Sequence, residues 1–136
     1  MPPAQAEEAV DVSIGIVNWR TADETIACVH SIRASRPVCR YEVRILDNAS
    51  GDGSVERIRA KLPDVELIAN PRNAGFGAAH NLLAKHATGR YLLLINPDCR
   101  ATPWAVDALL EFMTSQPRAG VAGPLTVSPE GTRLAS

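Results

Sequence analysis

The segment Asn96-Pro97-Asp98 contains the side chains whose chemistry is easiest to name. It directly follows an apolar run, Tyr91 to Ile95, which is typical of a buried strand. The carboxylate of Asp98 is a ligand type that Mg²⁺ and Mn²⁺ favour, and such a cation can also bind phosphate oxygens. The proline would restrict the backbone and fix the direction of its neighbours. An ordinary turn is the alternative, because Asn, Pro and Asp are common turn residues.

A second segment, Asn73 to Gly77, has features that suit a phosphate group. Asn73 is a candidate N-cap, and the glycines at 75 and 77 allow a backbone to approach a ligand closely. The N-terminus of the following helix would attract an anion. As a dinucleotide fingerprint, GFGAAH lacks the third glycine and does not follow the first strand. A glycine-rich turn into a packed helix explains the same residues without a ligand.

Asp47 and Asn48 end another strand-like stretch, and Asn18 ends the first one. A carboxylate at the end of a strand can accept hydrogen bonds from a ribose hydroxyl or from the N–H of a base. The same residues also suit a turn, with Asp52 or Ser54 capping the next helix. These residues alone leave both interpretations open.

Several other side chains are explained more simply by packing. Trp19 could stack on a base, but a partly buried aromatic residue after a strand is the commoner case. His30, His80 and His86 lie on helical segments without ligand spacing, so we expect them to be surface or packing residues. The three cysteines are widely spaced and form no CxxC pair, which predicts free thiols in a cytosolic protein.

The stretches that would position these residues alternate between strand-like and helix-like patterns. Strands are predicted at 12–18, 41–47, 65–70 and 91–95, with a fifth at 119–127. Helices are predicted between them, the second ending at Pro63, and another beginning at Thr102-Pro103. This alternation predicts an α/β fold with a mainly parallel sheet and helices on both faces. Ligands bind at the carboxyl ends of such strands, so Asn18, Asp47 and Asn96 should share one edge.

Composition excludes several function classes. The 136 residues suffice for one compact domain, and 46% hydrophobic with 21% charged residues is ordinary for a globular protein. A net charge of -1 gives no electrostatic reason to expect nucleic-acid binding. No apolar run approaches the roughly 18 residues of a membrane span. Residues 1–11 are polar and acidic, which predicts a flexible tail before a domain at 12–136 rather than a signal peptide.

Four segments occur together in a characteristic order: VSIGIVNWRTADETIACVHSI, VRILDNASGDGS, NPRNAGFGAAHN and RYLLLINPDC. This combination resembles the inverting family 2 glycosyltransferases of the GT-A fold, in particular the rhamnosyltransferase-like branch. NPD takes the place of the DxD motif of that fold. The resemblance implies a Rossmann-like nucleotide-diphospho-sugar transferase fold. It implies that the nucleotide sugar contacts Val17, Asn18, Asp47, Asn48, Asn73, Gly75 and Asn96, and that Asp98 binds a divalent metal, Mn²⁺ or Mg²⁺. Because an amide stands at 96, metal affinity would depend on Asp98.

The same resemblance implies a sugar transfer with inversion in cell wall or polysaccharide biosynthesis. The donor would be a dTDP- or UDP-sugar, with rhamnose as the expectation for this branch, and the acceptor a glycan or a lipid-linked glycan. A lipid-linked acceptor would bring a cytoplasmic protein to the inner face of the membrane as a peripheral partner. A dinucleotide-binding domain is disfavoured because VNWRTAD contains no glycine.

In this family the general base lies in a C-terminal part beyond the metal motif. No residue of the present chain matches its position, so no catalytic base is assigned, and we expect the chain to be a donor-binding half truncated after the metal motif. A noncatalytic nucleotide-sugar-binding module or a truncated remnant is the alternative. A truncated sheet would also expose apolar surface, which favours a homo-oligomer.

Overall fold

The computed structural model describes residues 9–134. Its elements, in chain order, are β1 (Val12–Asn18), α1 (Ala22–Ala34), β2 (Tyr41–Asp47), α2 (Ser54–Lys61), β3 (Glu66–Ala69), α3 (Phe76–His86), β4 (Tyr91–Leu94) and α4 (Ala105–Ser115). The first four predicted strands are present, and β3 and β4 are each shorter than expected. Residues 1–8 lie outside the described part, whereas Val10 and Asp11 accept hydrogen bonds from the backbone of residues 90 and 91. The expected flexible tail therefore does not extend to residues 10 and 11.

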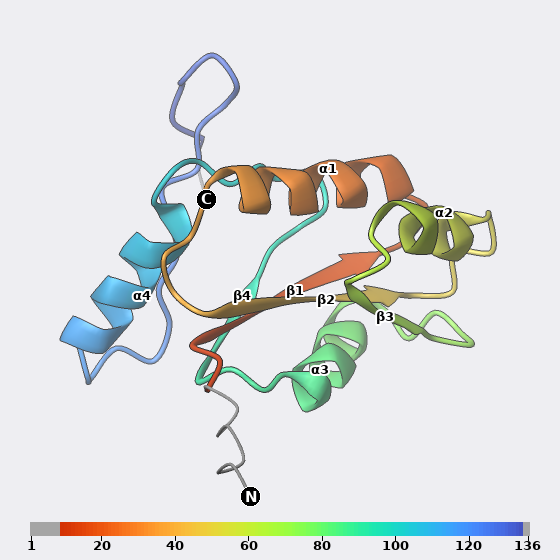
Figure 1. Cartoon of the computed structure of the whole chain (residues 1–136), viewed down its shortest axis with the longest axis horizontal. Helices are drawn as coiled ribbons and strands as arrows, with labels where there is room; N and C mark the ends of the chain where they lie inside the picture. Colours follow the sequence, from red (N-terminus) through yellow and green to blue (C-terminus); the bar gives the residue numbers. More distant parts are fainter. Residues whose placement is uncertain (1–8, 135–136) are drawn as a thin grey trace, which may run out of the picture.

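The four strands form one parallel sheet in the order β3-β2-β1-β4. Helices α1 and α2 cover one face, α3 lies on the other, and α4 stands beside β4 (Figure 1). This arrangement confirms the expected α/β fold with helices on both faces. Parallel strands end at the same edge of a sheet, so the loops after β1 and β2 lie side by side.

The core centres on β1, which pairs with β2 on one side and β4 on the other and has helices packed on both faces (Figure 1). Its side chains are buried from Val12 to Ile16, as expected for the central strand of a parallel sheet. Gly15 allows α3 to pack closely, because a Cβ atom there would lie 2.3 Å from Leu83 Cδ2. Helix α3 therefore packs closely against β1 on one face of the sheet (Figure 1).

The prediction that Tyr91 to Ile95 is a buried strand is wrong. β4 pairs only with β1 among the described residues, and its side chains alternate between half-buried and exposed. Leu92 and Leu94 are 40% and 47% exposed. The cause is that α3 packs on β1 and β2 and does not cover the side of β4 that carries Leu92 and Leu94.

The C-terminal part also differs from expectation. Helix α4 begins at Ala105, and Trp104, with φ 68°, separates it from the expected start at Thr102-Pro103. No strand forms at 119–127, where an isolated antiparallel bridge joins Val127 to Arg133. Two glycines and a proline lie within 120–124, and such residues disfavour a strand interior.

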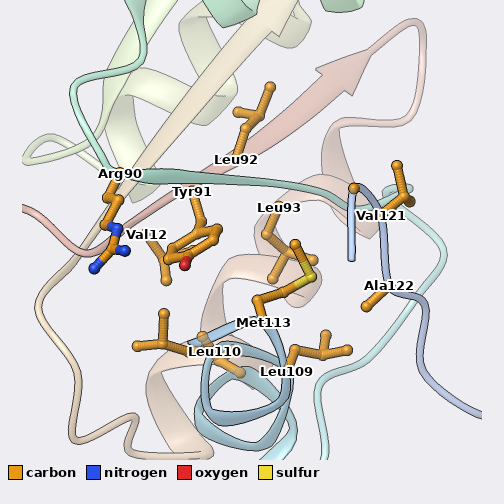
Figure 2. A pocket seen from close by; sticks show the side chains of 12 residues that line it. Val12, Arg90, Tyr91, Leu92, Leu93, Leu109, Leu110, Met113, Val121 and Ala122 are labelled. Atoms are coloured by element: carbon orange, nitrogen blue, oxygen red, sulfur yellow. The ribbon is translucent and has the colours of Figure 1, made fainter. Parts of the chain in front are cut away.

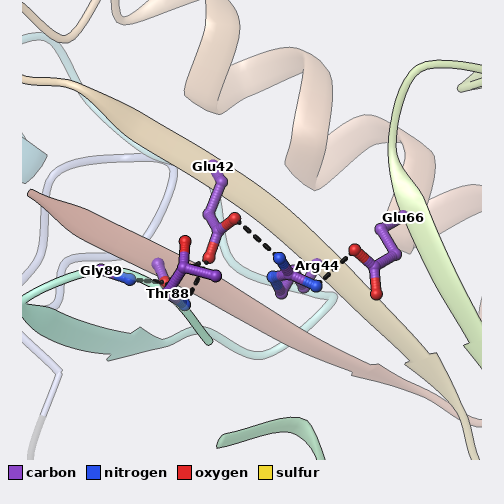
Figure 3. Close-up of polar contacts among 6 residues, drawn as sticks. Glu42, Arg44, Glu66, Thr88 and Gly89 are labelled. Carbon is purple, nitrogen blue, oxygen red and sulfur yellow. Dashed lines mark hydrogen bonds and ion pairs between the residues drawn. The ribbon is translucent and has the colours of Figure 1, made fainter. Parts of the chain in front are cut away.

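A polar network, which we call the amino-end network, lies near the start of the strands (Figure 3). Arg44 forms ion pairs with Glu42, 3.0 Å away, and with Glu66. Glu42 also accepts hydrogen bonds from the hydroxyl of Ser13 at 2.5 Å and from Thr88 N–H at 2.9 Å. Burial works to raise the pKa of Glu42, but its hydrogen bonds, from Arg44 first, outweigh burial and lower the pKa to about 2.

Among residues 9–134, no helix has the length and apolar character needed to cross a membrane. The three cysteines at 28, 39 and 99 are free thiols, as the sequence predicts.

Candidate functional site

The carboxyl ends of β1 and β2 bring two predicted site residues together. Asn18 and Asp47 are register partners at the last position of each strand, and Asn48 N–H donates to Asn18 O at 2.8 Å. We call this place, where β1 and β2 end and their loops begin, the carboxyl edge. The adjacent Val17 is half-buried and packs against the apolar cluster of Leu46 and Leu83 on the α3 side.

Asn18 and Asp47 belong to a buried hydrogen-bonded group, the inner cluster, formed with Thr25 and Ser50. Asn18 Nδ2 donates to Asp47 Oδ1 at 2.7 Å, and Asn18 Oδ1 accepts from Thr25 Oγ1 at 2.7 Å. Ser50 donates to Asp47 from its N–H at 3.0 Å and from its Oγ at 2.5 Å. Asn18 is 0% and Asp47 is 2% exposed, so both side chains are already satisfied within the fold.

A second group surrounds the side chain of Asn48, which is 4% exposed. Its Oδ1 accepts hydrogen bonds from Asn70 Nδ2 at 3.2 Å and from Ala74 N–H at 3.0 Å. Its Nδ2 donates to Asn73 Oδ1 at 3.0 Å and lies 3.4 Å from Gly75 O. Asn48 therefore joins the end of β2 to the loop between β3 and α3.

The loop leading into α3 is exposed at Asn73 and Gly75. The expected capping role of Asn73 is wrong, because α3 begins at Phe76 and Gly75, with φ 79°, is its N-cap residue. Asn73 Oδ1 instead accepts Gly75 N–H at 2.8 Å. A positive φ suits glycine, and a Cβ atom built at Gly75 would meet nothing within 4 Å. The backbone here is open to a ligand.

Asn96 and Asp98 are exposed and stand apart from these two groups. The segment after β4 turns away from β1 within one residue. Ile95 N–H still donates to Gly15 O of β1 at 3.1 Å, but Asn96 O already lies 3.8 Å from Cys28 Sγ in α1. Burial raises the pKa of Cys28 to about 11, so its thiol keeps the proton that it donates. The structure therefore places the NPD turn against α1, without a side-chain hydrogen bond to the inner cluster in the described chain.

Within residues 9–134, no group of three His, Cys, Asp or Glu side chains could hold a metal ion. Asp98 is a single carboxylate on a turn that Arg100 Nη1 stabilises by donating to Pro97 O at 2.9 Å and Cys99 O at 2.8 Å. One carboxylate fits Mg²⁺ or Mn²⁺ when phosphate oxygens and water supply the other ligands. These residues fit a metal shared with a bound diphosphate, rather than a cage made by the protein alone.

An apolar groove between β4, α4 and residues 120–122 is separate from this edge (Figure 2). It has a volume of about 350 Å³, and it is lined by Leu109, Leu110 and Met113 of α4 and by Tyr91 and Leu93 on the opposite side. None of the predicted site residues lines it.

Sequence reasoning missed the roles of Thr25 and Ser50, which complete the inner cluster. One signal was present: Thr25 lies on the helical face that also carries Cys28, Val29 and Ile32, and a polar residue on a buried face needs a partner. His80 is buried and its Nδ1 lies 2.8 Å from Phe76 O within α3, which agrees with the packing role expected for it.

Solved structures share this architecture. A mannosyltransferase from Pyrobaculum calidifontis, in complex with GDP-Man and Mn²⁺, aligns with TM-score 0.67 at 20% identity over 91% of this chain and 37% of that chain. S. aureus TarS 1-349, in complex with UDP-GlcNAc, aligns with TM-score 0.66 at 19% identity over 85% of this chain and 38% of that chain. These similarities confirm the expected GT-A fold.

Sequence relatives agree with the fold. An N-acetylglucosaminyl-diphospho-decaprenol L-rhamnosyltransferase of Mycobacterium tuberculosis is 33% identical over 113 residues, covering 75% of this chain and 36% of the relative. The succinoglycan biosynthesis protein ExoO of Rhizobium meliloti is 30% identical over 113 residues, covering 82% of this chain and 32% of the relative. The chain thus spans about a third of the length of these relatives. Residues 13–135 match the family described as Glycosyl transferase family 2, and the chain belongs to that family.

Proposed function

We propose that this chain binds the nucleotide sugar for a glycosyltransferase. The reaction is the transfer of a sugar, rhamnose by likeness to the mycobacterial relative, from a dTDP- or UDP-sugar with inversion at the anomeric carbon. The observation that carries the proposal is the convergence of Asn18, Asp47, Asn48, Asn73 and Gly75 at one edge of the sheet. Strand ends of parallel α/β sheets are where ligands bind.

Each part of the donor has a candidate partner. The base would lie against Val17 and Asn18 and near Asp47, while the exposed backbone at Asn73 and Gly75 would border the nucleotide. Asn96 would face the ribose or the sugar phosphate, and Asp98 would contact a divalent cation, Mn²⁺ or Mg²⁺. When bound, such a cation neutralises charge on the leaving diphosphate. The neighbour solved with GDP-Man and Mn²⁺ supports this part of the proposal.

The acceptor is proposed to be a glycan or a lipid-linked glycan, by likeness to a relative whose name includes a decaprenol diphosphate. A lipid-linked acceptor would bring the protein to the inner, cytoplasmic face of the membrane. The exposed Leu92 and Leu94 of β4 support the expected association into a homo-oligomer. A noncatalytic nucleotide-sugar-binding module is the alternative, and it predicts the same binding without transfer.

A thermal-shift screen of UDP, dTDP and their sugars, with and without Mn²⁺, tests the proposal. A ligand that binds only the folded chain must raise its melting temperature. We expect a nucleoside diphosphate to raise the melting temperature, and we expect Mn²⁺ to increase this shift. Asp98→Ala should abolish the additional shift caused by Mn²⁺ and leave the fold intact, because this side chain is exposed. No shift with any nucleotide would refute the proposal, and a metal effect that survives Asp98→Ala would remove Asp98 from the metal site.

A further inference from the structure

The hydroxyl of Ser50 joins the loop after β2 to the loop after β1. Ser50 is 1% exposed, and its Oγ accepts Arg20 N–H at 2.8 Å while donating to Asp47 Oδ1 at 2.5 Å. Asn18 Nδ2 lies 3.2 Å from the same oxygen. One hydroxyl therefore contacts the backbone N–H of Arg20, the amide at the end of β1 and the carboxylate at the end of β2.

The residue that Ser50 holds has an unfavourable backbone conformation. Arg20 has φ 57°, in the left-handed region where a Cβ atom crowds the neighbouring carbonyl. Two bonds to Ser50 oppose this cost: Arg20 N–H donates to Ser50 Oγ, and Arg20 Nε donates to Ser50 O at 3.2 Å. Ala49, immediately before Ser50, is also left-handed, with φ 60°. Both loops therefore turn sharply at the point where Ser50 connects them.

The turn that Ser50 holds carries an aromatic ring and a cation. Trp19 follows Asn18 directly, is 50% exposed, and has the Arg20 guanidinium 5.2 Å from its ring centroid. An exposed ring and a cation at the carboxyl edge would face whatever binds there. If the turn relaxed out of the left-handed conformation, both side chains would move relative to Asn18.

We propose that Ser50 is a positioning residue for nucleotide binding, because its hydroxyl holds the turn that presents Trp19 and Arg20 at the carboxyl edge. This inference rests on the proposed function. A hydroxyl with a purely structural role would affect stability alone, and nucleotide affinity of the folded protein would be unchanged.

The first test is Ser50→Ala in residues 1–136, with dTDP and UDP titrated calorimetrically at a temperature where the variant is folded. We expect the Kd to rise roughly tenfold, since Arg20 N–H loses its acceptor and Asp47 a donor. Ser35→Ala is the matched control. It also removes a buried hydroxyl, one that donates to Ile32 O at the C-terminal end of α1, and it should leave the Kd unchanged.

A matched pair isolates the backbone conformation. Ser50→Ala combined with Arg20→Gly should bind nucleotide roughly threefold more tightly than Ser50→Ala combined with Arg20→Ala, because glycine accepts a positive φ. Both variants lack the guanidinium, so they differ only in the cost of the left-handed turn. If Ser50→Ala does not fold, Arg20→Gly and Arg20→Ala are compared with Ser50 intact, and the same order is expected. Equal affinities within the pair would overturn the inference.

A measurement without ligand tests whether Ser50 holds the turn at Trp19. In a Trp104→Phe background, Trp19 is the single tryptophan, because the chain has two. Ser50→Ala should then increase acrylamide quenching of Trp19 fluorescence. Nucleotide binding by the native chain with an unchanged Kd for Ser50→Ala overturns the inference alone. Absence of nucleotide binding by the native chain overturns both it and the proposed function, even if quenching shows that Ser50 holds the turn.

Discussion

The same two strands, β1 and β2, carry a polar pair at each end, and the two pairs are built differently. At the amino end, Ser13 is the register partner of Glu42, and Arg44 forms ion pairs with Glu42 and Glu66. At the carboxyl edge, Asn18 is the register partner of Asp47, whose hydrogen bonds within the described chain come from an amide, a hydroxyl and a backbone N–H.

The difference leads us to expect a stabilising role for the amino-end network and a nucleotide-binding role for the carboxyl edge. In the amino-end network, Arg44 forms ion pairs with two carboxylates, and Thr88 and Gly89 N–H groups fix the loop before β4 (Figure 3). In the inner cluster, neutral donors orient Asp47 and Asn18 without an ion pair, beside the exposed Trp19, Asn73 and Gly75. We therefore expect changes at the amino end to affect folding, and changes at the carboxyl edge to affect nucleotide binding as well.

The largest effect is expected from Asp47→Ala, which removes the carboxylate that Asn18 and Ser50 contact. Nucleotide binding in metal-free buffer should weaken by about 1.5–3 kcal/mol, with a loss of stability alongside it. Isothermal titration calorimetry checks the affinity. The exposed Asp23→Ala serves as the control, since Asp23 forms an ion pair with the exposed Arg57. Unchanged affinity in Asp47→Ala would assign Asp47 to the fold alone.

Arg44→Ala tests the other side of the comparison. It removes the cation between Glu42 and Glu66 and should lower the free energy of unfolding by about 2 kcal/mol, because Glu42 is largely buried. Urea denaturation measures this loss, and Arg57→Ala, which breaks an exposed ion pair, serves as the control and should leave the free energy of unfolding nearly unchanged. Nucleotide affinity should stay at the native value. A loss of affinity in Arg44→Ala would mean that the two ends are not independent.

A pH dependence belongs to the amino end. The pKa of Glu42 falls from the ordinary 4.5 to about 2 on folding, so the folded protein releases this proton more readily than the unfolded chain. The corresponding stability is present above pH 4.5 and is lost as the pH falls toward 2. As the pH is lowered across this interval, the melting temperature of Glu42→Gln should therefore fall less steeply than that of the native protein. Parallel curves would show that Glu42 does not contribute.

The smallest effect is expected from Thr25→Val, which removes one donor to Asn18 Oδ1 and keeps a side chain of similar shape. Stability should fall by about 1 kcal/mol, measured by urea denaturation. Thr21 Oγ1, 3.2 Å from the same oxygen, remains as a second donor, so nucleotide affinity should change less than in Asp47→Ala. An equal loss of affinity in the two variants would give Thr25 as large a role as Asp47.

Local patterns were sufficient for the existence and order of the elements from β1 to α4, but they also predicted a strand at 119–127 that does not form. The apolar runs of β1 and β2 predicted the parallel sheet, which the structure contains, and the polar residues after them predicted that Asn18 and Asp47 would lie at one edge of it. They were not sufficient for β4, because an apolar run such as 91–95 has the same appearance at an edge as in the centre of a sheet. Exposure of Leu92 and Leu94 depends on which elements cover them, and that is a contact between distant segments.

Short-range periodicity and turn chemistry are enough to predict the α/β alternation and the polar residues at the ends of the strands. Which of those residues meet depends on how distant segments pack. Asn18 and Asp47 are joined because β1 and β2 are neighbours in register, while Asp98 stands apart because the chain after β4 turns toward α1. Ser50 likewise acquires its role only when two loops, thirty residues apart at Arg20 and Ser50, fold against each other. Strand order and register arise from packing over the whole sheet, and no local spacing encodes them.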